Sequence, residues 1–196
     1  MDEHPGTPCY VGTIYFVRPV SYGVSCPPIG LLYIDPLPTT LRGIVFVSST
    51  QAILEEYPGG PFAGFRGLEP KARLGGSAML VYEGEFDGRA AAARMLYRRA
   101  IVLFGLGRSR EALEDSESAL ALAPNSAVAH CVHSGAMVRL GGDPKQAMEE
   151  ATVAWHLALT DPHQAEALEA TEEVMRDIAR TWGVPLPDGV KAEAGR

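Results

Sequence analysis

The stretch that decides the fold is residues 96–124, which read LYRRAIVLFGLGRSREALEDSESALALAP. Its turn and helix-contact positions return 35 residues later in the chain. The corresponding positions are Gly107 and Gly142, Ala112 and Ala147, Ala119 and Ala154, and Pro124 and Leu159. A period close to this one, with Gly in a turn and Ala at close helix contacts, is typical of helix–turn–helix repeats. Because one such unit cannot bury its apolar stripe alone, neighbouring units stack into a shared core and expose a grooved surface.

The order of residue types in this stretch resembles the signature of the tetratricopeptide repeat (TPR) family. The matching positions are Leu96, Ala100, Leu103, Gly107, Ala112, Ala119 and Pro124. Two positions depart from the signature: Arg99 stands where a Leu is usual, and Ser116 stands where an aromatic residue is usual. A second, looser unit has one extra residue in its turn and no closing Pro; it matches at His130, His133, Ser134, Met137, Gly142, Ala147 and Ala154. The resemblance covers residues 88–183, about half of the chain, and implies stacked helical hairpins like a fragment of an α-solenoid.

Glycine and proline set the N-terminal part of the chain apart. Residues 1–88 contain 10 of the 15 Pro and 13 of the 21 Gly, a density that excludes long helices there. Runs of β-branched and aromatic residues predict strands at 11–17, 31–34, 43–47 and 78–82. A short helix capped by Ser49 is predicted at 49–57, residues 59–76 are expected to be irregular, and 58–67 to form a linker. We therefore expect an α+β protein that is mainly α.

Cap residues mark the helices of the C-terminal half. The predicted helices are 88–105 after Asp87, one from Ser109 to Ala123, one from Ser126 to Gly141, one that begins at Pro144 after Asp143, and a capping helix at about 162–182 after Asp161. The expected domains are a Gly/Pro-rich, β-containing segment at 1–86, a helical repeat module at 87–183 and a disordered tail at 184–196.

Charge and composition narrow the classes of partner and location. The net charge of −7 makes the whole chain a poor non-specific binder of nucleic acid. No run of 18 apolar residues occurs, and Asp2 and Glu3 give the N-terminus the wrong charge for a secretory signal, so we expect a cytoplasmic protein outside the membrane. The three cysteines lack a C-x-x-C spacing, which favours reduced thiols over a disulfide or a zinc site.

The TPR resemblance also implies a binding groove, because the first helix of each pair lines the concave face in that family. The side chains it places there are Arg94, Tyr97, Arg98, Ile101, Cys131, Gly135, Val138 and Arg139. Three Arg and one Tyr suit an acidic peptide or a C-terminal carboxylate, because guanidinium groups bind carboxylates bidentately. The alternative is that the Arg residues form a solvated face, partly paired with Glu111 and Asp115.

Some more specific functions are not supported by the sequence. Chaperone-binding members of the family hold a terminal carboxylate with Lys and Asn, where this chain carries Tyr97, Ile101, Cys131 and Gly135. The His130-x-x-His133 pair could bind a metal, but in this resemblance both histidines take packing positions, so we expect no metal and no cofactor. No motif for nucleophilic catalysis occurs, and no catalytic residue is assigned.

The predicted function is that of a TPR-type adaptor or scaffold that binds a peptide segment of a partner protein, rather than an enzyme. Two alternatives remain. In the first, residues 1–88 bind a small molecule in a pocket formed by Tyr15, Phe46, Phe62 and Phe65, with the repeats as scaffold. In the second, the unpaired first helix stacks on its twin in a homo-oligomer.

Overall fold

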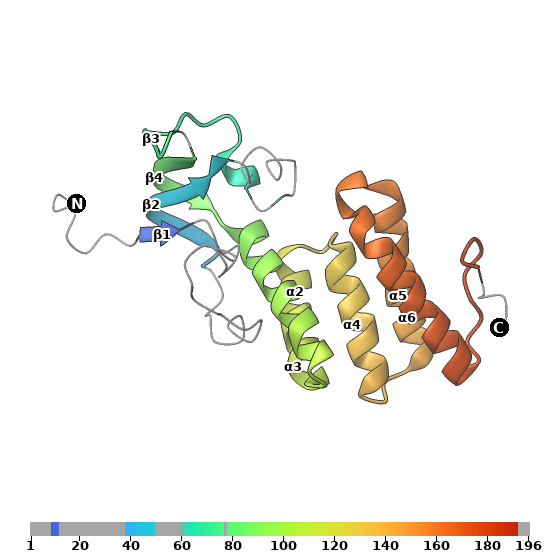
Figure 1. Ribbon diagram of the computed structural model, residues 1–196. Coiled ribbons are helices and arrows are strands. Elements are labelled where there is room, and N and C mark those ends of the chain that lie inside the picture. Colours follow the sequence, from blue (N-terminus) through green and yellow to red (C-terminus); the bar gives the residue numbers. More distant parts are fainter. Residues whose placement is uncertain (1–8, 12–37, 50–59, 61, 77, 192–196) are drawn as a thin grey trace. The chain divides into compact units, whose positions relative to one another are not determined.

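The computed structural model describes residues 9–11, 38–49, 60, 62–76 and 78–191. Contacts divide the chain into two compact units, Met1–Met95 and Leu96–Arg196 (Figure 1). A small sheet lies in the first unit and the second is helical, which confirms the expected mainly helical α+β class. The expected boundary between residues 86 and 87 differs from the observed one, because helix α2 (Arg89–Gly105) begins in the first unit and ends in the second.

The sheet of the first unit has the strand order β1-β2-β4-β3. Its strands are β1 (Cys9–Val11), β2 (Thr40–Ser48), β3 (Ala72–Leu74) and β4 (Met79–Asp87). β1 is parallel to β2, whereas β2 and β3 are antiparallel to β4, with Thr40 opposite Asp87 and Ser48 opposite Met79. The strands predicted at 43–47 and 78–82 are therefore confirmed, and both are longer than expected. Of the strand predicted at 11–17 only Val11 is described; the strand at 31–34 and the helix at 49–57, apart from Ser49, lie outside the described residues.

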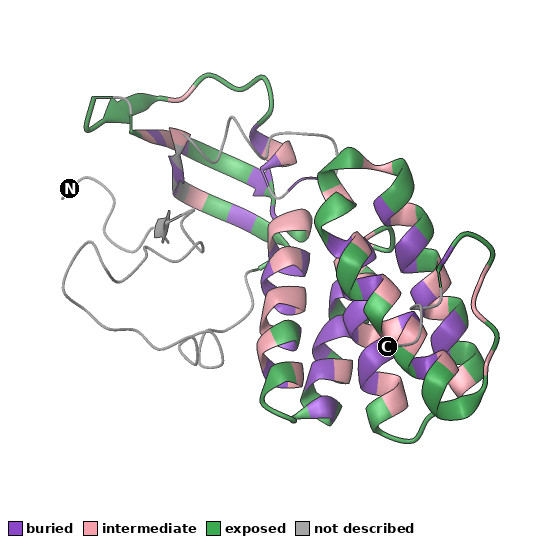
Figure 2. Cartoon of the chain, turned by 45° about the vertical axis from the view of Figure 1, so that its right-hand side comes forward, coloured by how far each residue is buried: buried purple, intermediate pink, exposed green. Residues whose placement is uncertain are grey.

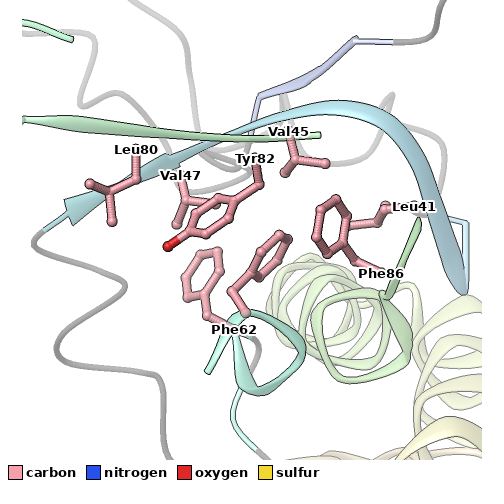
Figure 3. Packing of buried hydrophobic residues seen from close by; sticks show 8 residues of the cluster. Leu41, Val45, Val47, Phe62, Leu80, Tyr82 and Phe86 are labelled. Carbon is pink, nitrogen blue, oxygen red and sulfur yellow. The ribbon is translucent and has the colours of Figure 1, made fainter. Parts of the chain in front are cut away.

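An aromatic cluster forms the core of this unit. The rings of Phe62, Tyr82 and Phe86 converge with aliphatic side chains of β2 (Figure 3). The ring centroid of Phe65 lies 5.0 Å from that of Tyr82 and 4.7 Å from that of Phe86. Gly64 permits this approach, because a β carbon there would lie 2.7 Å from the carbonyl oxygen of Asp87.

The linker predicted at 58–67 and the irregular structure predicted at 59–76 are thus wrong in part. The short 3₁₀ turn η3 (Ala63–Phe65) and β3 lie inside these ranges. Phe62 and Phe65 fall on one side of that turn because their spacing of three matches its period. Both fill the core rather than line an open pocket. The other two residues of the expected small-molecule pocket are not tested, since Tyr15 and the side chain of Phe46 lie outside the described part of the chain.

The helices of the second unit begin and end close to the predicted positions. After α2 follow α3 (Ser109–Leu122), α4 (Ala127–Arg139), α5 (Pro144–Thr160), η4 (Pro162–Ala167) and α6 (Leu168–Trp182). The side chains of Asp143 and Asp161 each accept a backbone N–H two residues later, both at 2.9 Å, and Gly183 ends α6 in the left-handed conformation. These two acidic caps and the glycine stop confirm the cap assignments.

The capping helix expected at about 162–182 starts with a 3₁₀ segment, η4, instead of an α-helical turn. Gln164 explains the tighter winding, because its amide joins two elements. Its Nε2 donates to Asp161 Oδ2 (3.0 Å), and its Oε1 accepts the N–H of Ala127 at the start of α4 (2.6 Å). The segment also brings Ala167 into a buried cluster with Ala127 and Ala158.

The two consecutive helix pairs share the same turn. Gly107 and Gly141 both have φ = +77°, and each donates its N–H to a carbonyl three residues earlier, at 3.1 and 3.0 Å. The left-handed counterpart of Gly107 is therefore Gly141, 34 positions later, and not Gly142 as the sequence suggested. Gly142 is the extra residue of the second turn, so the repeat spacing changes to 35 only after it.

Small residues lie at the helix contacts of both pairs. The side chains that are fully buried include Ala100, Ala112, Ala119, Ser134, Ala147 and Ala154. Along the chain, α3 packs on α4, α4 on α5, and α5 on α6. In Figure 2 buried positions recur along each of these helices between exposed ones, as expected for amphipathic helices that pack on one another. Among the described residues, no helix combines the length and apolar character needed to cross a bilayer.

The segment Val184–Val190, here named the strap, differs from the disordered tail that we expected at 184–196. Val190 is only 8% exposed and belongs to the same cluster as Met148, Trp155 and Ile178. Residues 192–196 lie outside the described residues.

Replacing Asp161 by alanine tests the cap at the start of η4, which also holds the Gln164 side chain that contacts α4. Hydrogen bonds from the Gln164 side chain and the His163 backbone hold the pKa of Asp161 below its ordinary value. We expect Asp161→Ala to lower the free energy of unfolding by about 1 kcal/mol at neutral pH. Because the folded pKa is the lower one, this contribution is complete above about pH 4 and is lost as the pH falls through the folded pKa.

Urea unfolding of both proteins, from neutral pH to about pH 2, measures this difference. Asp161→Asn is the matched control, since it keeps an acceptor oxygen at the cap without the charge. It should cost less than the alanine variant at neutral pH. A difference between wild type and Asp161→Ala that persists unchanged in acid would contradict the assigned role of the carboxylate.

Candidate interaction surface

The predicted groove residues of α2 follow one another along the helix. Arg94 belongs to the first unit and is half-buried. Tyr97, Arg98 and Ile101 belong to the second unit, where residues three and four apart share a helix face. Tyr97 and Arg98 are half-buried, and Ile101 is 44% exposed. An aromatic ring, a guanidinium group and an exposed aliphatic side chain therefore lie together on this part of α2.

Arg139 connects the C-terminal end of α4 to the C-terminal end of α2. Its Nη1 donates to the carbonyl oxygen of Phe104 (2.8 Å), and its guanidinium carbon lies 3.6 Å from the centroid of the Phe104 ring. Such a cation–π contact contributes about 0.5–1 kcal/mol at an exposed site. Arg139 thus has a structural role that the sequence did not reveal. Because a guanidinium has five N–H donors and this residue is exposed, it can hold Phe104 and still meet a ligand.

Phe104 is a surface residue that the sequence reasoning missed. A β carbon on Gly135 would lie 3.0 Å from Phe104 Cζ, so the glycine leaves room for the ring against α4. Phe104 precedes Val138, an expected groove residue, by the 34 positions that separate the two turns, and this spacing could have identified it. The resulting α2–α4 surface comprises Tyr97, Arg98, Ile101, Phe104 and Arg139. Val138, which was expected in the groove, packs instead on the buried cluster of α5 and α6.

Cys131 does not belong to this surface, which corrects its assignment to the groove. The residue is 7% exposed. Burial, the largest effect, raises the pKa of its thiol, and a hydrogen bond with Thr171 on α6 acts in the opposite direction. The side chain is therefore covered by α6, and a partner molecule cannot reach it in this conformation.

A partly buried ion pair explains why Arg99 replaces the leucine of the family signature. Arg99 Nε and Nη2 donate to the two carboxylate oxygens of Asp115, both at 2.6 Å, in the bidentate arrangement typical of strong pairs. The side chains are only 19% and 11% exposed. The pair joins α2 to α3. The neighbouring Ser116, the second departure from the signature, is fully buried and donates its hydroxyl to the carbonyl of Leu113 (2.8 Å).

Histidines take the corresponding place in the second helix pair. His133 lies 34 positions after Arg99, and Glu150 lies 35 positions after Asp115. His130 Nδ1 is 2.7 Å from Glu150 Oε2, and its Nε2 is 2.9 Å from the carbonyl oxygen of Pro124. Both ring nitrogens of His130 thus have a hydrogen-bond partner.

His133 completes this polar contact between helices α3, α4 and α5. Its Nε2 lies 3.8 Å from Glu117 Oε1, and its Nδ1 lies 3.8 Å from Glu150 Oε2. Both histidines are half-buried, as their packing positions predicted. Within the described ranges, no group of three or more His, Cys, Asp or Glu residues is arranged to hold a metal ion. The histidines therefore act as polar contacts between neighbouring helices.

Removing one partner of the Arg99–Asp115 pair tests how far the helix pair depends on it. We expect Asp115→Ala to lower the free energy of unfolding by about 3 kcal/mol, because it leaves a partly buried guanidinium without its carboxylate. The double variant Arg99→Leu/Asp115→Ala, which restores the leucine usual in the family at position 99, should cost much less than the sum of its two single changes. Chemical denaturation of wild type, Arg99→Leu, Asp115→Ala and the double variant measures the coupling.

Glu111→Ala provides the matched control, since Glu111 pairs with Arg108 at an exposed position. This control should change stability by far less than Asp115→Ala. A loss in the double variant equal to the sum of the two single losses would show that the charges contribute no coupling between α2 and α3.

The resemblance to the TPR family is based on the residues of this chain alone. No family model, curated protein or solved structure matches the chain. The residues that the structure describes form a small four-stranded sheet followed by packed helices.

Proposed function

We propose that the chain is a protein–protein interaction module of the TPR type, acting as an adaptor or scaffold. The observation that carries this proposal is that two consecutive helix pairs share the same turn and the same type of helix contact. Both pairs turn at a left-handed glycine, at Gly107 and Gly141, and both bury alanines fully at the helix contacts. Stacked pairs of this kind expose extended surfaces that suit peptide segments.

The α2–α4 surface is the proposed binding site for a partner segment. Tyr97 and Phe104 offer aromatic area, Ile101 offers aliphatic area, and Arg98 and Arg139 offer guanidinium groups. Aromatic residues and Arg are the residue types that dominate binding energy at protein interfaces. The expected partner is an extended segment that carries acidic side chains or a C-terminal carboxylate, because guanidinium groups bind carboxylates bidentately.

The alternative is that the Arg residues form a solvated face, partly paired with Glu111 and Asp115. Asp115 is held bidentately by Arg99, and Glu111 is held by Arg108. These two acids thus pair with arginines outside the α2–α4 surface, and the solvated face itself stays the alternative to a binding site. A cytoplasmic setting remains part of the proposal, and the buried free thiol of Cys131 suits a reducing compartment.

Charge reversal on the α2–α4 surface tests the proposal. The variant Arg98→Glu/Arg139→Glu should recover at least about tenfold less partner than wild type when tagged proteins capture partners from the native host, because an acidic segment is then repelled. Ile101→Asp should have a similar effect through the apolar part of the surface. Quantitative mass spectrometry of the captured proteins is the measurement.

Arg110→Glu is the control for charge reversal elsewhere on the helices, because it reverses one charge, half of the change in the double variant, at an exposed position of α3. Circular dichroism and thermal unfolding must show that each variant keeps its helices. If folded Arg98→Glu/Arg139→Glu captures the same proteins in the same amounts as wild type, the α2–α4 surface is not the binding site.

A further inference from the structure

The strap covers an apolar site on α5 and α6. Four members of the buried cluster to which Val190 belongs, Met148, Ala151, Trp155 and Ile178, are here named the strap site. Val184, Leu186 and Val190 of the strap pack on this cluster. Within the strap, the N–H of Val190 donates a hydrogen bond to the carbonyl oxygen of Pro187 (3.2 Å). Within the described residues, no backbone bond ties it to α5 or α6, so side-chain packing holds it in place.

The contact at Gly189 gives the strap site its selectivity. Gly189 has φ = +98°, and a β carbon there would lie 3.0 Å from Trp155 Cη2. The indole is oriented by a bond from its Nε1 to Glu172 Oε1 (3.3 Å). Only glycine therefore allows the strap backbone to pass over the ring, and Val190 follows directly into the buried cluster. The site thus accommodates a glycine followed by an aliphatic residue.

The strap can leave without disturbing the helix that precedes it. Gly183 ends α6 with φ = +68°, so the chain changes direction at a residue with unusual backbone freedom. Departure of the strap would uncover Trp155, which is 8% exposed, and its apolar neighbours. An exposed apolar patch of this kind on a folded protein marks a place where another protein binds.

We propose that the strap is an intramolecular ligand of the strap site, and that an extended segment of a partner protein replaces it there. The partner segment carries the pattern that the strap displays, a proline followed within a few residues by glycine and an aliphatic residue. The tether gives the strap an effective concentration on the order of millimolar. A second copy of the chain, which offers only the same strap, cannot compete at micromolar concentration. A partner segment succeeds when it adds contacts that the strap lacks.

A variant that opens the strap tests this proposal in the full-length chain. Val190→Asp places a charge in the buried cluster and should release the strap. In a Trp182→Phe background, which leaves Trp155 as the single tryptophan, acrylamide quenching of fluorescence should rise about twofold on release. A fluorescein-labelled peptide with the sequence of residues 183–191, GVPLPDGVK, should bind the open variant at least about tenfold more tightly than wild type.

Two controls make the result specific. Asp188→Ala changes an exposed strap residue and should behave as wild type. A peptide in which alanine replaces Gly189 should not bind the open variant, because its β carbon would meet Trp155. Gly189→Ala in the full chain is a second opening variant, in case Val190→Asp does not fold as judged by circular dichroism.

Several outcomes would overturn the proposal. Equal peptide binding to wild type and to the open variant, or no binding to either, would exclude a displaceable strap. Loss of folding in both opening variants would make the strap a fixed part of the core. Dimerisation of wild type that Val190→Asp abolishes, measured by light scattering, would assign the site to exchange between two copies instead.

Discussion

Direct contact between helices at fully buried alanines is the constraint on which the second unit depends. Ala112, Ala119, Ala147 and Ala154 are 0% exposed, and alanine loses no side-chain entropy when it is buried. A larger side chain at any of them would force the helices apart or strain the core. Because the helix backbones approach closely, long polar side chains reach from one helix to the next, as Arg99 reaches Asp115.

Because the helices are so close, polar side chains pair across them in both helix pairs, but with different chemical groups. The first pair places a guanidinium against a carboxylate, whereas the second places imidazole rings against Glu150. In both pairs an acidic residue of the second helix, Asp115 or Glu150, lies beside basic residues of the first. The surface left at the ends of α2 and α4 is shaped by another small residue, Gly135, which gives Phe104 its place. Small residues therefore determine both the core and the proposed binding surface.

Local signals made most of the helical unit predictable, and non-local packing limited the rest. Asp143, Asp161 and Gly183 act on backbone groups within a few residues, so their roles follow from sequence alone. Phe62 and Phe65 were mistaken for a linker because Gly and Pro around them obscured a core that forms only with β4. In the proposed site, Cys131 was misassigned and Phe104 missed, since exposure depends on α6 and on Gly135, respectively. The strap was unpredictable because its order depends on Trp155, far away in sequence.

The helix α2 has a consequence for how the protein folds. Residues 89–95 of this helix belong to the first unit and residues 96–105 to the second. An isolated helix shorter than about 12–15 residues is barely stable in water. Each portion of α2 therefore depends on packing within its own unit, as the burial of Ala100 and Leu103 shows for the second portion.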